Sequence, residues 1–206
     1  MTLAQSAERV IAELKELAEL TSTPDGAQRV AWGPVWHKAR DWFEAKVKDM
    51  GLTMQRDSAG NAWVTLPGKS EEVVIIGGHL DSVPNGGWLD GCLGTLSALE
   101  GLRRAQASGD IPCTLMVVDW ADEEGARFGR SLIGSAAAGG EAGSGSTSAG
   151  GGESSPSSRI SEPLCPVCRW CLRRPIPWLK ASPHSAQMCF FFLRPLATIL
   201  YSLTLC

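Results

Sequence analysis

The sequence predicts an α/β fold with a mixed, partly parallel sheet, followed by a tail of a different character. Two short apolar runs predict the sheet, because residues 73–76 (VVII) and 114–118 (TLMVV) are typical of strands buried on both faces. Residues 93–105 between these runs have helical spacing, which predicts a βαβ unit and hence a parallel strand pair. Near residue 139 the composition changes abruptly, which divides the chain into segments 1–139 and 140–206.

Two helices and a hairpin precede the βαβ unit. A helix is predicted up to about residue 20, and another over residues 34–50 with Gly51 as its C-terminal cap. Residues 52–55 and 62–66 flank a turn-like SAGN segment and predict an edge hairpin. The first helix has one apolar stripe, formed by Leu3, Val10, Leu14 and Leu17.

Charge, cysteine content and the chain start favour a cytoplasmic protein that acts on a small molecule. The net charge of −3 gives no basic footprint for nucleic acid or an anionic membrane. The first residues contain no secretory signal, so we expect a cytoplasmic location. Five of the seven cysteines follow residue 164, and we expect the other two, Cys92 and Cys113, to be reduced.

The sequence pattern of the tail, residues 140–206, predicts no fold. Small polar residues dominate up to residue 158 and predict disorder, and residues 159–206 show no sustained period of 2 or 3.6. Arg194 and Pro195 interrupt the apolar end, so we expect no membrane anchor. We hypothesise that this tail comes from a frameshift, a retained intron or a faulty gene model, which comparison of the genomic reading frames would test.

The first candidate constellation lies in residues 77–94, directly after the first predicted strand. Ligands in open α/β sheets bind just outside the carboxyl ends of strands, where His79 and Asp81 are delivered on one side of the backbone. Asp90 follows in a glycine-rich loop that lets it turn back toward the imidazole, and its two oxygens suit a bridge between two cations. A lone histidine after a strand is more often an ordinary loop residue, but the three together favour a metal site.

The second constellation, residues 119–125 (DWADEEG), follows the other predicted strand. Adjacent carboxylates at the mouth of a buried strand favour a bound cation, although an acidic loop without metal is the simpler alternative. The simplest assignment makes Glu124 a metal ligand and Glu123 a general base toward a metal-activated water.

These two segments, HLDSVPNGGWLDGCLG and DEEGARFGRSLIGS, resemble the family of two-zinc amidohydrolases that includes N-carbamoyl-L-amino-acid hydrolase, beta-ureidopropionase and allantoate amidohydrolase. The family is related to metal-dependent aminoacylases and aminopeptidases. The resemblance spans about residues 4–139, and it implies an incomplete metallo-aminopeptidase-like catalytic domain.

The resemblance implies hydrolysis of a carbamoyl, ureido or related non-peptide amide C–N bond, without a covalent intermediate. It implies two Zn²⁺ ions, with Mn²⁺, Co²⁺ or Ni²⁺ as possible substitutes. The implied roles are metal ligands at His79, Asp90 and Glu124, an orienting residue at Asp81, a base at Glu123, and substrate-site residues at Arg127, Phe128 and Ser131.

The sequence also departs from the family. Each family metal receives a further histidine from far downstream, whereas this sequence holds only His37, His79 and His184. His37 is expected on the surface of its helix, and His184 lies in the unassigned tail. The domain that forms the family's homodimer is missing, so we expect the chain as written to be inactive. A regulatory pseudoenzyme paired with an intact relative would also need that domain.

A non-catalytic zinc-binding or interaction protein is the alternative from a different class. It would use Cys165, Cys168 and Cys171, whose spacing suits zinc, with Cys189 or His184 as a fourth ligand.

Overall fold

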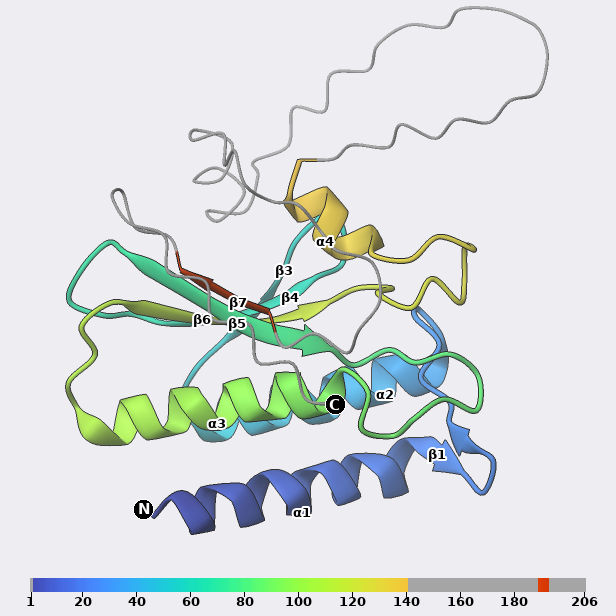
Figure 1. Cartoon of the computed structure of the whole chain (residues 1–206), viewed down its shortest axis with the longest axis horizontal. Coiled ribbons are helices and arrows are strands. Elements are labelled where there is room, and N and C mark those ends of the chain that lie inside the picture. The colour runs from blue at the N-terminus through green and yellow to red at the C-terminus, as the bar shows by residue number, and fades with distance from the viewer. Residues whose placement is uncertain (1, 141–188, 193–206) are drawn as a thin grey trace, which may run out of the picture.

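The computed structural model describes residues 2–140 and the strand 189–192 of this chain (Figure 1). The elements before the sheet are α1 (Leu3–Thr21), β1 (Ser22–Thr23), β2 (Gly26–Ala27) and α2 (Pro34–Asp49). The sheet and its connections follow as β3 (Met54–Arg56), β4 (Ala62–Leu66), β5 (Val73–His79), α3 (Cys92–Ser108), β6 (Thr114–Trp120), α4 (Ile133–Ala138) and β7 (Cys189–Phe192).

The sheet has the strand order β3-β4-β6-β5-β7 and is mixed. Strands β5 and β6 are parallel, with His79 opposite Trp120, and α3 forms the crossover between them. The other three pairings are antiparallel. The predicted mixed sheet with one parallel pair is therefore confirmed.

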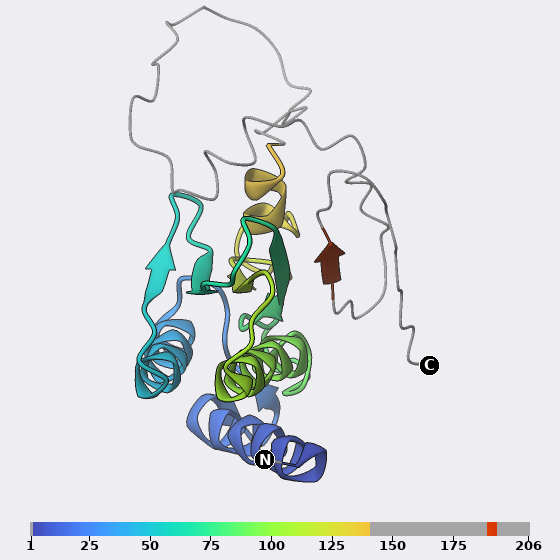
Figure 2. The same cartoon turned by 90° about the vertical axis from the view of Figure 1, so that its left-hand side faces the viewer.

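Helices α2 and α3 lie on one face of the sheet, and α1 packs against both helices (Figures 1 and 2). The main core fills this side, with Phe43 from α2, Val64 and Val117 from the sheet, and Leu99 from α3 all fully buried. Helix α4 lies on the opposite face (Figure 1), where a smaller cluster surrounds Trp63 and Trp120, whose rings meet edge to face at 5.3 Å.

Two sequence expectations about burial were wrong. Residues 73–76 are only half-buried: Val73 and Ile75 pack against the smaller cluster, and Ile76 is a partly buried neighbour of the main core. Leu3, the first residue of α1, is 75% exposed, whereas Val10, Leu14 and Leu17 are buried as expected.

The cap predicted at the end of α2 is confirmed. Gly51 follows α2 with φ of 72° and donates its N–H to the Lys48 carbonyl, as a C-terminal cap does. Cys92 and Cys113 are free thiols. Among the described residues, no helix combines the length and apolar character needed to span a membrane. The cysteine cluster at residues 165–171 and His184 lie outside the described residues.

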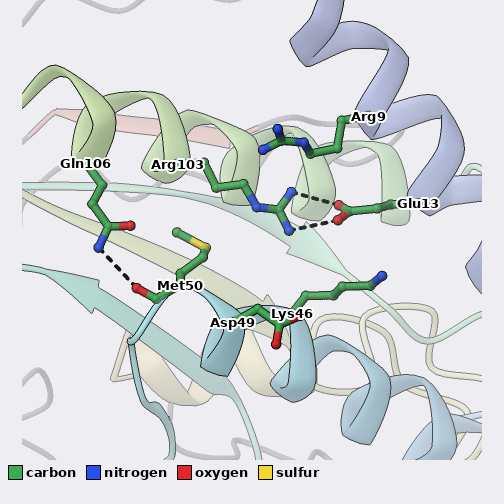
Figure 3. Close-up of a pocket in the computed structure, with 7 residues that line it drawn as sticks. All are labelled: Arg9, Glu13, Lys46, Asp49, Met50, Arg103 and Gln106. Carbon is green, nitrogen blue, oxygen red and sulfur yellow. Dashed lines mark hydrogen bonds and ion pairs between the residues drawn. The ribbon is translucent and has the colours of Figure 1, made fainter. Parts of the chain in front are cut away.

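An open pocket of about 390 Å³ lies between α1, α2 and α3 (Figure 3). Figure 3 shows the Arg103 guanidinium facing the Glu13 carboxylate across it. None of the predicted site residues lines this pocket.

Candidate metal centre

The candidate site forms where the two parallel strands β5 and β6 end. Parallel strands deliver their carboxyl ends to the same sheet edge, so His79 at the end of β5 meets the loop that follows Trp120 at the end of β6. The Asp90 loop joins them through Gly91, the residue before α3.

His79 and Asp81 lie on the same side of the backbone, as their spacing predicts. The His79 Nδ1 atom is 3.1 Å from the Asp81 carbonyl oxygen and 3.5 Å from Asp81 Oδ1. The Asp81 carboxylate is buried, and it accepts the backbone N–H groups of Glu123 at 3.3 Å and Glu124 at 3.2 Å. Asp81 therefore orients the imidazole and ties the acidic loop to the end of β5.

Asp90 turns back toward His79, with its Oδ1 atom 3.9 Å from His79 Nε2. Gly91 makes this approach possible. Its φ is 65°, and a Cβ at this position would lie 2.4 Å from the His79 carbonyl oxygen. Only glycine permits both the backbone conformation and the close passage.

Glu123 approaches the same imidazole nitrogen, with its Oε2 atom 3.5 Å from His79 Nε2. Burial raises the pKa of Glu123, and although His79 lowers it, Asp81 and Asp90 add to the rise. Burial also raises the pKa of Glu124, with the same opposition from His79 and further repulsion from neighbouring carboxylates. The acidic side chains are thus crowded and partly desolvated, which a bound cation would relieve.

The imidazole of His79 responds to this crowding. Burial lowers its pKa, but the hydrogen bond and charge of Asp81, together with the charge of Glu123, outweigh burial and raise the pKa of His79 to about 9. In the metal-free protein a positive imidazolium therefore balances part of the negative charge at neutral pH.

The donor set fits a divalent metal in kind. An imidazole nitrogen faces two carboxylates, a combination that suits Zn²⁺ as well as Mn²⁺, Co²⁺ and Ni²⁺. Within residues 2–140, however, no three His, Cys, Asp or Glu side chains are gathered closely enough to count as a coordination sphere. His79, Asp90 and Glu123 therefore approach one another, but the described residues do not hold three donors in a ready coordination sphere.

The three predicted substrate residues lie on the exposed loop that follows the acidic pair. Arg127 donates to the Ala31 carbonyl at 3.3 Å, and the ring of Phe128, which is 62% exposed, lies 5.4 Å from that of Trp32. Ser131 is exposed as well. Arg127 also acts on the neighbouring Asp122, since it opposes the rise that burial causes in the pKa of that carboxyl.

His37 lies outside the candidate site. It is exposed on α2, as expected, and its ring contacts that of Trp36 with centroids 5.0 Å apart.

Several buried polar side chains that support the site were missed from the sequence. Asn61 accepts the Ala121 N–H at 2.9 Å and donates to Asp57 and to the Gly134 carbonyl, which anchors the acidic loop. Arg29 and Arg40 are both fully buried. Their positions follow from tertiary contacts, and Asn61 showed only a turn signal in the sequence.

Comparison with known proteins identifies relatives over the same part of the chain. The model of peptidase family M28 matches residues 61–145, which include all the predicted site residues. The N-carbamoyl-L-amino acid amidohydrolase of Geobacillus stearothermophilus is 37% identical over 134 residues, covering 63% of this chain and 33% of that protein. A hydantoinase/carbamoylase family amidase from Burkholderia ambifaria superposes with a TM-score of 0.63 at 34% identity, covering 66% of this chain and 34% of that one.

Over its N-terminal part, the chain is homologous to the carbamoylase-type amidohydrolases. The allantoate amidohydrolase of Escherichia coli (strain K12) is a further relative, 36% identical over 106 residues that cover 50% of this chain and 26% of that protein. The recognition of the carbamoylase type and its α/β catalytic fold are confirmed for this part. The chain spans about a third of the length of the first two relatives.

Proposed function

We propose that the site hydrolyses carbon–nitrogen bonds of the carbamoyl, ureido or related non-peptide amide type, such as those of N-carbamoyl-L-amino acids. The observation that carries the proposal is the convergence of Asp81, Asp90 and Glu123 on the two nitrogens of His79, at 3.5, 3.9 and 3.5 Å. The names of the N-carbamoyl-L-amino acid and allantoate amidohydrolases support the bond type.

His79, Asp90 and Glu124 are the proposed metal ligands. The exposed carboxylate of Asp90 has two oxygens and would bridge two ions, which we propose to be Zn²⁺, with Mn²⁺, Co²⁺ or Ni²⁺ as substitutes. When bound, such an ion lowers the pKa of a water molecule and polarises the scissile carbonyl. Asp81 holds the imidazole orientation through Nδ1.

Glu123 is the proposed general base. It reaches the imidazole face of the site, and burial raises its pKa toward the range in which a carboxylate both accepts and returns a proton. It would take the proton of the attacking water and pass it to the leaving nitrogen. Asp81 accepts the Glu123 backbone N–H and so fixes the base beside the histidine.

The proposal includes Arg127, Phe128 and Ser131 as residues that shape the substrate side of the site. It also includes a cytoplasmic location and a small-molecule substrate, with neither nucleic acid nor membrane as partner. Homodimer formation stays what the resemblance implies for the family.

We also propose that the chain as given is inactive on its own. The sequence holds three histidines, and among the described residues His79 alone lies at the site. The expected result is no ammonia release from N-carbamoyl-L-amino acids above a metal-only blank. Hydrolysis that depends on Glu123 would overturn this part of the proposal.

The competence of this segment can be tested in a chimera. Residues 2–140 would replace the corresponding N-terminal part of the Geobacillus stearothermophilus amidohydrolase. We expect the chimera to hydrolyse N-carbamoyl-L-amino acids and Glu123→Gln to lower kcat by about 10²- to 10⁴-fold, the usual contribution of a general base.

Glu19→Gln, an exposed change on α1, is the matched control and should leave kcat unchanged. Zn²⁺ binding by the Glu123→Gln chimera should persist, which separates loss of the base from loss of the metal. A folded, zinc-loaded chimera without hydrolytic activity, or one in which Glu123→Gln is fully active, would contradict the proposed function.

A further inference from the structure

Leu80 lies between the proposed ligand His79 and the orienting residue Asp81, and both of its peptide groups are held by side chains from distant segments. Its N–H donates to Asp119 Oδ1 at 2.7 Å, and its carbonyl accepts from Arg29 Nε at 2.7 Å. Leu80, Arg29 and Asp119 are all fully buried. In such an environment each hydrogen bond has little competition from water and strongly restricts the backbone.

The N–H side of this arrangement depends on Arg40 from α2. Arg40 Nε donates to Asp119 Oδ2 at 2.7 Å, and Arg40 Nη2 donates to the Asp119 carbonyl at 3.1 Å. The guanidinium also bonds the Gly60 carbonyl and lies 4.0 Å from the centre of the Trp36 ring. Arg40 thus fixes the carboxylate that in turn holds the Leu80 N–H.

The carbonyl side depends on Arg29, which uses its whole guanidinium group. Besides Leu80, it donates to Thr21 Oγ1 at 3.1 Å and to Cys92 Sγ at 3.1 Å. The backbone of Arg29 exchanges two hydrogen bonds with Ser82, one to Ser82 Oγ at 3.0 Å and one from the Ser82 N–H at 3.0 Å. Arg29 therefore holds the chain immediately before and after Asp81.

Arg29 carries its positive charge at a fully buried position. Burying a guanidinium without an adjacent carboxylate is costly, and Arg29 forms no ion pair in the part of the chain that the structure describes. Its thiol partner Cys92 opens α3 two residues after Asp90. The guanidinium of Arg29 is instead satisfied by neutral acceptors, the Leu80 carbonyl, the Thr21 hydroxyl and the Cys92 sulfur.

We propose that Arg29 and Arg40 are positioning residues of the metal centre. They act through the two peptide groups of Leu80 to fix the spacing between the His79 imidazole and the Asp81 carboxylate. We call the hydrogen bonds that hold the two Leu80 peptide groups the clamp. The clamp follows from the geometry alone, whereas its effect on metal affinity rests on the proposed function.

The test compares Arg29→Met with Arg103→Met in the full chain. Arg103 is also largely shielded from solvent, at 11% exposure, but it pairs with Glu13 of α1 and Glu100 of α3. Both substitutions should lower the midpoint of urea denaturation. Only Arg29→Met should weaken Zn²⁺ binding, by about 10- to 100-fold, the range for groups that orient metal ligands.

Hydrogen exchange gives a second readout that does not depend on metal. Arg40→Met and Arg40→Lys should speed exchange of the Leu80 amide relative to that of Val117 in the centre of β6, because Arg40 fixes the Asp119 carboxylate that accepts this N–H. Arg103→Met should leave this ratio unchanged. Arg29→Lys keeps the charge without the planar fork. We expect it to restore part of the Zn²⁺ affinity, and it carries the affinity test should Arg29→Met fail to fold.

An unchanged Leu80 to Val117 exchange ratio in both Arg40→Met and Arg40→Lys would overturn the clamp. Equal Zn²⁺ affinities for the Arg29→Met and Arg103→Met proteins would overturn its role toward the metal. If the wild-type chain binds no Zn²⁺ but the variants show the predicted exchange ratios, the proposed function is contradicted and the clamp stands.

Discussion

Charged side chains hold α1 and α3 together at the pocket shown in Figure 3. Arg103 donates to both carboxylate oxygens of Glu13, at 2.9 and 2.8 Å, and to Glu100 at 3.2 Å. All three side chains are nearly buried, with 11%, 9% and 4% exposure. A two-pronged pair of this kind is geometrically specific, and removing Glu13 leaves the shielded Arg103 charge with Glu100 as its remaining partner.

We therefore predict that Glu13→Gln lowers the free energy of unfolding by about 3 kcal/mol, the low end for a broken buried pair. Asp110→Ala is the control, because its pair with Lys69 is 75% and 73% exposed and should contribute at most about 1 kcal/mol. Urea denaturation followed by tryptophan fluorescence measures both. Equal losses in the two variants would show that the α1–α3 pair does not act as a buried ion pair.

At the scale of elements, what the sequence predicted depends on how strong each periodic pattern is. The second helix and the βαβ unit matched, because residues 34–50, 73–76 and 114–118 carry long or uniformly apolar signals. The β1–β2 hairpin and α4 were not predicted, since they are short and their pattern is weak. Strand β5 also continues beyond its apolar run, through Gly77 and Gly78 to His79.

The continuation of β5 depends on close packing at Gly77. A Cβ on Gly77 would lie 2.0 Å from the Val118 carbonyl oxygen of the neighbouring strand. We predict that Gly77→Ala destabilises the protein by about 1–3 kcal/mol or more, the usual cost of overpacking.

Gly101→Ala in α3 should do the opposite and stabilise by about 0.5–1 kcal/mol, because nothing lies within 4 Å of its added Cβ and alanine favours a helix. Melting temperatures of the two alanine variants give the comparison. A Gly77→Ala protein as stable as Gly101→Ala would contradict the packing of β5 on β6.

At the scale of the whole molecule, the first forty residues brace a site whose own residues lie between positions 79 and 131. Arg29 binds the Leu80 carbonyl, and Arg40 holds the Asp119 carboxylate that accepts the Leu80 N–H. Ala27 exchanges backbone hydrogen bonds with Gly86 in the site loop. The His79, Asp81 and Asp90 cluster could be predicted because its residues follow one strand in sequence. The contacts of Arg29 and Arg40 could not be predicted, because their partners lie about 50 to 80 residues away in the sequence.

Calorimetric titration of Zn²⁺ into the full chain measures whether His79, Asp90 and Glu124 bind a divalent metal. We predict binding that Asp90→Asn and Glu124→Gln each weaken at least about tenfold, since each removes a proposed ligand. A combined Cys165→Ser, Cys168→Ser and Cys171→Ser variant should bind Zn²⁺ as the wild type does. Binding that survives both carboxylate changes but is lost with the three cysteines would contradict the account and assign the zinc to the cysteine cluster.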